Sequence, residues 1–366
     1  MNIFKRCFST IKEINKYSNR INKKITIRNL IDFKNINENH RKQLLNEDLK
    51  SRLSEKIIEI ENFPYGISMM PSIQKVNEWY IKSFNELNKA NLIENNDYCK
   101  ILENIYDRHS STLITVANGI NEYKTFLKEL YGQDFDLHYY LKNNNRGKNI
   151  NNYLNDFYTN RISIRLLISH FLELSNQNKN DIYYNGIISI KEPLINVLNE
   201  AVEVTSIICE RNYEEVPDVK IEIKGDIPQF PFIRNNMYYI FIEILKNSMK
   251  STLDKYNITG YLEDINILIC NNDDNITMKI SDKGNGIKYY NLKHVWSYFY
   301  STAKIQRLNL NYDEIKDFDK TTPLAGFGYG LPITKLSVEY FNDDIFINSI
   351  EDLGTDVLLH FQKNII

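Results

Sequence analysis

The hydrophobic pattern of the chain changes near residue 180, and this change limits the folds that the sequence can adopt. Before it, apolar residues recur at intervals of three and four, as at Leu53, Ile57 and Ile60, which is typical of amphipathic helices. After it, several short segments alternate apolar and polar residues, which is typical of half-buried strands. Because 366 residues exceed the usual length of one domain, we expect a helical domain followed by a mixed one.

The same pattern predicts individual elements. In the first half it predicts four long helices, two of them around 98–130 and 153–174. In the second half, the predicted helices cover about 193–210, 235–255 and 328–341, and the predicted strands cover 187–190, 219–223, 265–270, 276–280 and 357–361. This order predicts an α+β chain, in which an N-terminal four-helix bundle precedes an α/β sandwich with helices on one face of a mixed sheet.

The N-terminal segment is strongly basic. Its first 24 residues contain a single acid, Glu13, against Lys5, Arg6, Lys12, Lys16, Arg20, Lys23 and Lys24. A positive amphipathic segment of this kind is typical of mitochondrial presequences, and Arg6-Cys7-Phe8-Ser9 resembles a cleavage motif. We therefore expect a transit peptide over 1–25, a helical domain over 26–178 and a second domain over 179–366. A basic tail on a cytosolic protein is the alternative.

Composition makes several function classes poor candidates. The formal net charge of −2 gives no broad attraction for nucleic acid. The cysteines, Cys7, Cys99, Cys209 and Cys270, lie far apart and lack the paired spacing of a zinc site or a disulfide framework. No run of about 20 apolar residues occurs, so we expect no transmembrane segment.

Chemistry-bearing residues gather first in the predicted helix at 235–255. Glu243, Lys246, Asn247 and Lys250 stand at positions i, i+3, i+4 and i+7, so they share one helix face. Taken alone, this is an ordinary amphipathic helix with a solvated charged stripe.

Three glycine-containing segments follow along the chain. Asp282-Lys283-Gly284-Asn285-Gly286 comes after a predicted strand, where the glycines allow close backbone approach. Gly326-Phe327-Gly328-Tyr329-Gly330 precedes a predicted helix, an arrangement that can hold phosphate. Gly354-Thr355 comes just before the last strand. Each segment also fits an ordinary turn, so none of them is specific alone.

The order of these segments is more specific than any one of them. A helix with Asn247, then Asp282 with its glycines, then 326–330, then Gly354-Thr355, resembles the Bergerat ATP-binding fold of histidine kinases, type II topoisomerases and Hsp90. Longer stretches narrow the resemblance to the mitochondrial 2-oxoacid dehydrogenase kinases, which act on the pyruvate or the branched-chain complex. They are EILKNSMKST at 243–252, ISDKGNGI at 280–287, YSTA at 300–303 and PLAGFGYGLPI at 323–333.

The resemblance implies an ATP and Mg²⁺ site. Asn247 would bind the metal through its amide oxygen, a hard ligand for a hard ion. Asp282 would accept a hydrogen bond from the adenine amino group, and residues 303–325 would form a lid. The other residues implied to bind nucleotide are Lys250, Gly284, Gly286, Ser301, Thr302, Gly326, Phe327, Gly328, Tyr329, Gly330, Leu331 and Thr355.

The resemblance also implies the chemistry. Glu243 would be the general base that accepts the proton of a substrate serine, and Lys246 would stabilise the developing charge. The helix spacing agrees, because a carboxylate at i and a metal ligand at i+4 project into one cleft.

Further implications concern regulation and assembly. Tyr80, Ser83, His109, Arg161 and Arg165 match an allosteric pocket for pyruvate-like acids, in which two arginines bind a small carboxylate. Helix-packing residues with a buried ion pair are the alternative. The family implies a homodimer in the mitochondrial matrix that docks on lipoyl domains of the E2 acyltransferase. The expected activity is phosphorylation and inactivation of the E1α subunit of the pyruvate dehydrogenase complex.

Three alternatives stay open. Tyr239 stands where many pyruvate dehydrogenase kinases have histidine, which favours the branched-chain group, although the Arg161–Arg165 segment favours the pyruvate group. A non-catalytic ATP-binding adaptor is a second alternative, against which the intact Glu243, Lys246 and Asn247 argue. A histidine kinase is the third, but His109 is followed by Ser110 and Ser111 rather than by an acid.

Overall fold

The structure is a computed structural model that describes residues 11–90, 95–132, 150–176, 182–300 and 328–363. Its internal contacts divide the chain into two compact units. Among the described residues, the first unit contains 11–25 and 32–176, and the second contains 26–31, 182–300 and 328–363.

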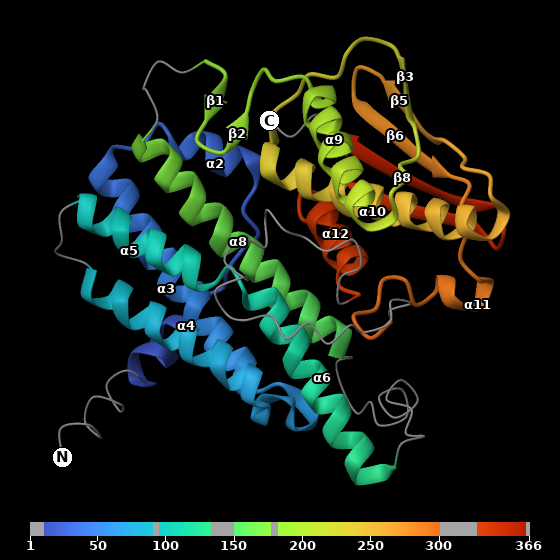
Figure 1. Cartoon of the computed structure of the whole chain (residues 1–366). Helices are drawn as coiled ribbons and strands as arrows, with labels where there is room; N and C mark the ends of the chain where they lie inside the picture. Colours follow the sequence, from blue (N-terminus) through green and yellow to red (C-terminus); the bar gives the residue numbers. More distant parts are fainter. Residues whose placement is uncertain (1–10, 91–94, 133–149, 177–181, 301–327, 364–366) are drawn as a thin grey trace. The chain divides into compact units, whose positions relative to one another are not determined.

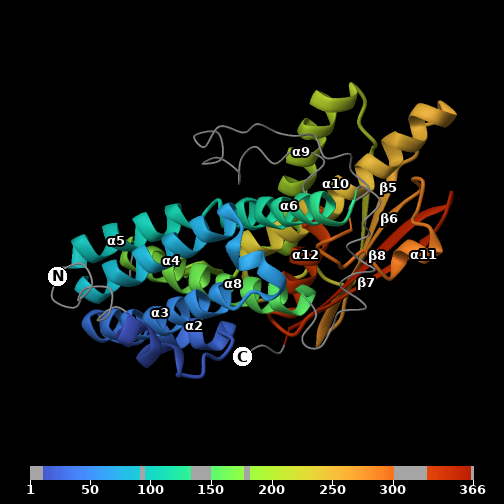
Figure 2. The same ribbon diagram turned by 90° about the horizontal axis from the view of Figure 1, so that it is seen from below.

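Helices form the described part of the first unit. They are α3 (Glu38–Glu61), α4 (Pro71–Lys89), α5 (Asn95–Arg108), α6 (Thr112–Tyr131) and α8 (Ile150–Asn176), with the short η1 (Pro64–Met69) between α3 and α4. Helix α2 (Ile27–Phe33) runs across the boundary between the units. Both views in Figures 1 and 2 show α3, α4, α5 and α8 side by side. Buried residues such as Leu53, Phe84 and Phe157 fill the space between them.

The helix expected around 98–130 is two helices, α5 and α6, with a turn at 109–111. In this turn, both the backbone N–H and the side-chain hydroxyl of Ser110 donate to the carbonyl of Asp107, at 3.0 and 2.7 Å. Serine side chains compete in this way with the helical hydrogen-bond ladder. The break is what places His109 between the helices, where its side chain is buried.

The described part of the basic N-terminal segment contacts α3 and α4. Residues 11–18 are helical, and the Tyr17 ring lies edge-on to Phe84 with centroids 6.0 Å apart. The Tyr17 hydroxyl accepts from the ammonium of Lys50 at 2.8 Å and donates to Glu47 at 3.1 Å. Residues 11–25 therefore contribute buried side chains to the first unit, although they lie within the expected transit peptide.

The second unit combines helices and two sheets. Its helices are α9 (Leu194–Tyr213), α10 (Arg234–Thr259), α11 (Tyr289–Leu292) and α12 (Gly330–Glu339). The larger sheet has the strand order β3-β5-β6-β8-β7, formed by β3 (Val219–Lys224), β5 (Ile265–Asn271), β6 (Asn275–Asp282), β8 (Gly354–Gln362) and β7 (Asp344–Ile350). Strands β3 and β5 are parallel and the other pairs antiparallel. The smaller sheet pairs β1 (Tyr184–Asn185), β2 (Ile188–Ser189) and β4 (Phe232–Ile233).

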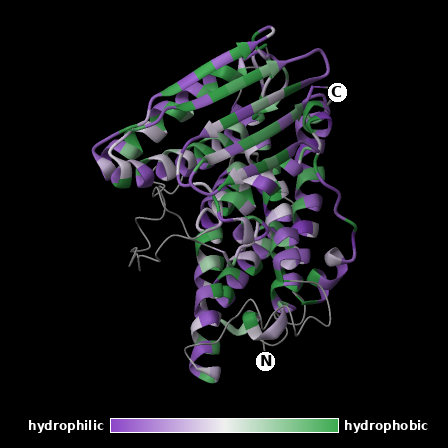
Figure 3. Cartoon of the chain, turned by 90° about the vertical axis from the view of Figure 1, so that its right-hand side faces the viewer, coloured by the Kyte–Doolittle hydropathy of each residue, from purple (hydrophilic) through white to green (hydrophobic). Residues whose placement is uncertain are grey.

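One face of the larger sheet is buried against helices. The register aligns Ile267 with Ile280 and Ile280 with Val357, and all three side chains are buried. They share one hydrophobic core with residues of α9, α10 and α12. Figure 3 shows the alternation along the strands as bands of hydrophobic and hydrophilic residues. The predicted α+β class, with a mixed sheet covered by helices, is confirmed.

Strand β7 was not predicted from the sequence. Its apolar residues do not alternate cleanly, because Ile345 lies on the buried face while the neighbouring Phe346 is 58% exposed on the other. The pattern therefore lacks the period of two on which strand prediction depends.

Among the described residues, no helix combines the length and the apolar character needed to cross a membrane.

Candidate functional site

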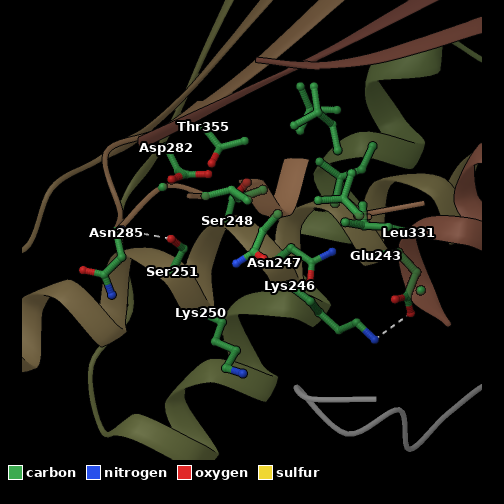
Figure 4. A pocket seen from close by; sticks show the side chains of 18 of the residues that line it. Glu243, Lys246, Asn247, Ser248, Lys250, Ser251, Asp282, Asn285, Leu331 and Thr355 are labelled. Carbon is green, nitrogen blue, oxygen red and sulfur yellow. Dashed lines mark hydrogen bonds and ion pairs between the residues drawn. The ribbon is translucent and has the colours of Figure 1, made fainter. Parts of the chain in front are cut away.

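A cavity of about 440 Å³ opens in the second unit beside α10 (Figure 4). Its walls come from α10, the end of β6 and the segment after it, the start of α12, and strands β7 and β8. The predicted site residues that line it are Glu243, Lys246, Asn247, Lys250, Asp282, Gly286, Gly328, Gly330, Leu331 and Thr355. Residues separated by more than a hundred positions along the sequence thus meet in one cavity.

Helix α10 presents one face to this cavity. Glu243 and Lys246 are 9% and 3% exposed, and the Lys246 ammonium donates to Oε1 of Glu243 at 2.6 Å. Asn247, one position further on, is exposed and lines the cavity. Gly330 lies directly against Glu243, because a Cβ at this position would stand 2.3 Å from Oε2 of the carboxylate. A side chain at position 330 would therefore displace the carboxylate.

Asp282 lies at the opposite end of the cavity, where β6 ends. Its residue is 6% exposed, and its Oδ1 accepts from the backbone N–H of Gly284 at 3.0 Å. Burial raises the pKa of Asp282 to about 6, although hydrogen bonds from Gly284, Ser248 and Thr355 oppose the rise. Thr355 is its partner on β8, and Figure 4 shows the two side chains next to each other. This end of the cavity offers a buried acceptor for a polar group of a ligand.

Some predicted residues do not line the cavity. Gly284 is buried beside it, and Tyr329 packs its ring against Tyr298 with centroids 5.2 Å apart. Ser301, Thr302, Gly326 and Phe327, and the expected lid at 303–325, lie outside the described residues.

Three serines at the site were not predicted. Ser248 donates to Asp282, Ser251 accepts from the N–H of Asn285 at 3.1 Å, and Ser349 accepts from the N–H of Ile287 at 2.8 Å. Ser251 follows Asn247 by four residues, so the helix spacing could have indicated it. Ser349 had no such signal, because strand β7 itself was not predicted.

The residues of the predicted acid pocket form a cluster in the first unit, in which Tyr80, Ser83 and His109 are buried and the two arginines are partly exposed. The rings of Tyr80 and His109 lie 4.3 Å apart, and Nε2 of His109 is 2.9 Å from the Ser83 hydroxyl. Arg161 donates to the carbonyl of His109 at 3.1 Å, and the guanidinium of Arg165 stacks on Tyr106 at 3.8 Å. The structure therefore brings all five predicted residues into one region.

Charge and burial in this cluster depress two pKa values. Burial, and then the charges of nearby arginines, hold the pKa of His109 well below its usual range, so the ring is neutral near pH 7. Burial lowers the pKa of Arg161 to about 10, which leaves it charged. A partly exposed ion pair lies next to the cluster, where Arg108 binds Glu86 through two contacts of 2.8 and 2.9 Å and also donates to the Ser83 hydroxyl at 2.7 Å.

Comparisons with known proteins agree with both units. Residues 24–189 match the family described as mitochondrial branched-chain alpha-ketoacid dehydrogenase kinase. Residues 233–365 match the family described as histidine kinase-, DNA gyrase B-, and HSP90-like ATPase.

Individual relatives cover nearly the whole chain. A mitochondrial pyruvate dehydrogenase (acetyl-transferring) kinase of Arabidopsis thaliana is 31% identical over 328 residues, which cover 88% of this chain and 84% of the relative. Isozyme 3 of this kinase from Homo sapiens is 30% identical over 371 residues, 96% of this chain and 85% of the relative. Because these relatives are mitochondrial kinases, the expectations of an enzyme and of a mitochondrial matrix location are confirmed, and the adaptor alternative is not supported. The chain belongs to the mitochondrial pyruvate dehydrogenase kinase family and is an ATP-dependent protein kinase.

Proposed function

We propose that this kinase phosphorylates a serine of the E1α subunit of the mitochondrial pyruvate dehydrogenase complex and thereby inactivates it. The observation that carries the proposal is the shared face of α10, on which Glu243, Lys246 and Asn247 line the cavity that also contains Asp282. The names of the relatives support pyruvate dehydrogenase as the target.

Glu243 is the general base in this proposal. Its Oε1 is bound by Lys246, so we assign Oε2 to the substrate hydroxyl, whose proton it accepts as the serine oxygen attacks the γ-phosphorus. Negative charge develops on the phosphoryl group during transfer. The Lys246 ammonium is already held in place beside Glu243, so it would stabilise this charge. The glycine at 330 leaves room for Oε2, because a side chain at this position would collide with it.

Asn247 is suited to hold Mg²⁺. Its amide is exposed at the cavity, while the described residues contain no group of three or more His, Cys, Asp or Glu side chains that could bind a metal by themselves. Mg²⁺ commonly uses one or two protein ligands together with substrate phosphates, and it neutralises charge on the phosphates when bound. A single amide at the cavity fits that mode.

The adenine end of the proposed site is Asp282 with Thr355. The carboxylate would accept a hydrogen bond from the exocyclic amino group of adenine, which guanine lacks at that position. Lys250, Gly284, Gly286, Ser301, Thr302 and the residues at 326–331 complete the proposed nucleotide site, with 303–325 as its lid.

A direct test compares two substrates. Transfer from γ-labelled ATP is measured side by side to purified E1α of the pyruvate complex and to E1α of the branched-chain complex. We expect label on a serine of the first. Label on the second alone would assign the enzyme to the branched-chain complex, which the family match over 24–189 favours. Label on neither would overturn both assignments.

We also propose that the kinase is a homodimer. The face of the sheet opposite the helices carries partly exposed apolar side chains, including Leu268, Leu358 and Phe346, the last of which is 58% exposed. A second copy of this sheet would cover them. Equilibrium sedimentation should give a dimer that Phe346→Asp converts to monomer. A monomeric unsubstituted protein would contradict the proposal.

Docking on lipoyl domains of E2 is proposed from the family alone.

The arginine cluster is our proposed site for pyruvate-like acids. Arg161 and Arg165 can supply paired charge-assisted hydrogen bonds to a carboxylate, and Tyr80, Ser83 and His109 surround them.

For the import signal, we propose that the part of segment 1–25 that is removed ends before residue 11, because the residues that follow are packed in the first unit.

A further inference from the structure

Lys255 lies on α10 about two turns beyond Asn247 and touches three backbone carbonyls at once. Its ammonium donates to the carbonyl oxygens of Lys283, Gly284 and Asp352, at 2.9, 3.4 and 2.8 Å. An ammonium has three N–H donors, so this arrangement can use all of them. Lys255 does not itself line the cavity.

The three carbonyls belong to the two segments that end at the adenine side of the cavity. Lys283 and Gly284 directly follow Asp282, and Asp352 lies in the turn between β7 and β8, three residues before Thr355. The segments are also joined directly, since the N–H of Asp352 donates to the carbonyl of Asn285 at 2.8 Å. Lys255 thus binds both sides of the junction that presents Asp282 and Thr355.

The junction rests closely on α10. A Cβ on Gly284 would stand 2.2 Å from the Ser251 hydroxyl oxygen, and that oxygen accepts from the N–H of Asn285. On the far side, the Ser349 hydroxyl donates to the carbonyl of Gly354 and lies 2.9 Å from the Thr355 hydroxyl. Figure 4 shows Ser251 and Asn285 joined by this bond, near Asp282 and Thr355.

We propose that Lys255 is a positioning residue for base specificity. By binding both segments it fixes the spacing between Asp282 and Thr355, so that the cavity discriminates adenine from guanine. The inference rests on the proposed role of Asp282 as the acceptor for the adenine amino group. Lys255 lies away from Glu243 and the catalytic end of α10, so its loss should weaken nucleotide binding without slowing the chemical step.

The test replaces Lys255 by methionine, which keeps the aliphatic chain and removes the ammonium. Dissociation constants for ATP and GTP are measured by calorimetry on the full chain, and kcat and KM for ATP on the dehydrogenase substrate. We expect Lys255→Met to weaken ATP binding about tenfold, the size expected for losing charge-assisted hydrogen bonds. GTP binding should change less than about twofold, and kcat at saturating ATP should stay within about twofold.

Two further lysine substitutions, one at Lys255 and one at a surface lysine, serve as controls for this result. Lys255→Arg keeps a cation with several donors and should recover part of the preference for ATP. Lys220→Met is the matched control, because Lys220 is 65% exposed and pairs with Asp264 at the surface. It should leave both dissociation constants unchanged.

Equal weakening of ATP and GTP binding in Lys255→Met, or unchanged ATP binding, would overturn the inference. If that variant does not fold, Ser349→Ala loosens the same junction from the other side and must narrow the preference for ATP. Asp282→Ala separates the two proposals. If it leaves ATP binding intact, the adenine role of Asp282 fails. If it abolishes the preference while Lys255→Met does not, only the role of Lys255 fails.

Discussion

The cavity of the second unit and the arginine cluster of the first both gather charged side chains, but they differ in how those side chains meet water. In the cavity, Asn247 is exposed and Lys250 is partly exposed, whereas Glu243 and Asp282 at its two ends are buried. In the cluster, Arg161 already donates to the carbonyl of His109, and His109 is 3% exposed. The cavity can therefore take a ligand as it stands, whereas an acid in the cluster must first displace existing contacts.

The two regions also differ in unsatisfied polar atoms. Nδ1 of His109 and Nε of Arg161 are buried and have no hydrogen-bond partner among the described residues. Such groups cost free energy unless a ligand or water meets them. A bound carboxylate would recover part of that cost, which is how a closed cluster can still bind an acid. We therefore expect substitutions in the cavity to affect catalysis strongly, and substitutions in the cluster to have weaker effects on regulation.

The largest expected effect comes from Glu243→Gln. The amide cannot accept the substrate proton, so kcat should fall by a factor on the order of 10³. The dissociation constant for ATP should stay within about twofold, since Glu243 lies at the far end of the cavity from Asp282. Stopped-time transfer of labelled phosphate and calorimetry measure the two quantities. Glu222→Gln, an exposed surface substitution, is the matched control. Retained turnover in Glu243→Gln would remove it from the mechanism.

The second prediction tests whether the first unit depends on its N-terminal segment. Deleting residues 1–25 removes Tyr17 and Ile14, both buried, and leaves the ammonium of Lys50 without the Tyr17 hydroxyl. Burial of two such side chains contributes on the order of 4 kcal/mol, so the unfolding transition of the first unit should shift to clearly lower temperature. Deleting residues 1–10 is the control and should leave the transition unchanged.

Mass spectrometry of the protein recovered from mitochondria gives an independent check of the same point. We expect its N-terminus to lie before residue 11. A mature chain that begins near residue 26 and remains as stable as the longer form would contradict the structural role of Tyr17.

The sequence predicted the elements whose apolar residues recur with a regular period and missed those whose pattern is irregular or broken by side-chain contacts. The face of α10 with Glu243 and Asn247 was predicted because helix spacing is a local property. The turn at His109 was not predicted, since it depends on serine side chains competing with the helix ladder. Strand β7 was not predicted, because Phe346 breaks the alternation, and Ser349 was missed with it. The arginine cluster came from the family resemblance, whereas its ion pair of Arg108 with Glu86 had no signal of its own.

The third prediction concerns pH and the end of the cavity at Asp282, the proposed acceptor for adenine. The pKa of Asp282 is raised from 3.8 to about 6, so the folded state holds this proton more tightly than the unfolded chain. Its contribution to the free energy of unfolding is therefore greatest below about pH 4 and is lost as the pH rises through about 6. In the proposed site, nucleotide recognition would have the opposite dependence, because the ionised carboxylate is a much stronger acceptor for the adenine amino group than the neutral carboxyl is.

We expect the preference for ATP over GTP to fall about tenfold as the pH is lowered from 7 to 5, since about one carboxyl in ten remains ionised one unit below its pKa. The ratio of the two dissociation constants is the quantity to measure, because titration of the phosphates affects both nucleotides alike. Asp282→Asn should abolish the pH dependence of this ratio. A ratio that stays constant in the unsubstituted protein would show that Asp282 does not read the base.

The smallest expected effect is in the arginine cluster. Dichloroacetate, a small acid, should inhibit the kinase, and Arg165→Ala should raise the inhibitory concentration about fivefold, somewhat less than the roughly tenfold or more that a charge-assisted hydrogen bond contributes. The effect is modest because Arg161 remains as a second cation, and because the acid must displace the contact of Arg161 with the carbonyl of His109. Arg20→Ala, whose surface pair with Glu47 lies on the same unit, is the control and should leave inhibition unchanged. Equal sensitivity of Arg165→Ala and the unsubstituted kinase would mean that the cluster only packs helices. In that case the two regions would differ in function as well as in exposure, because the cavity would bind a ligand and the cluster would not.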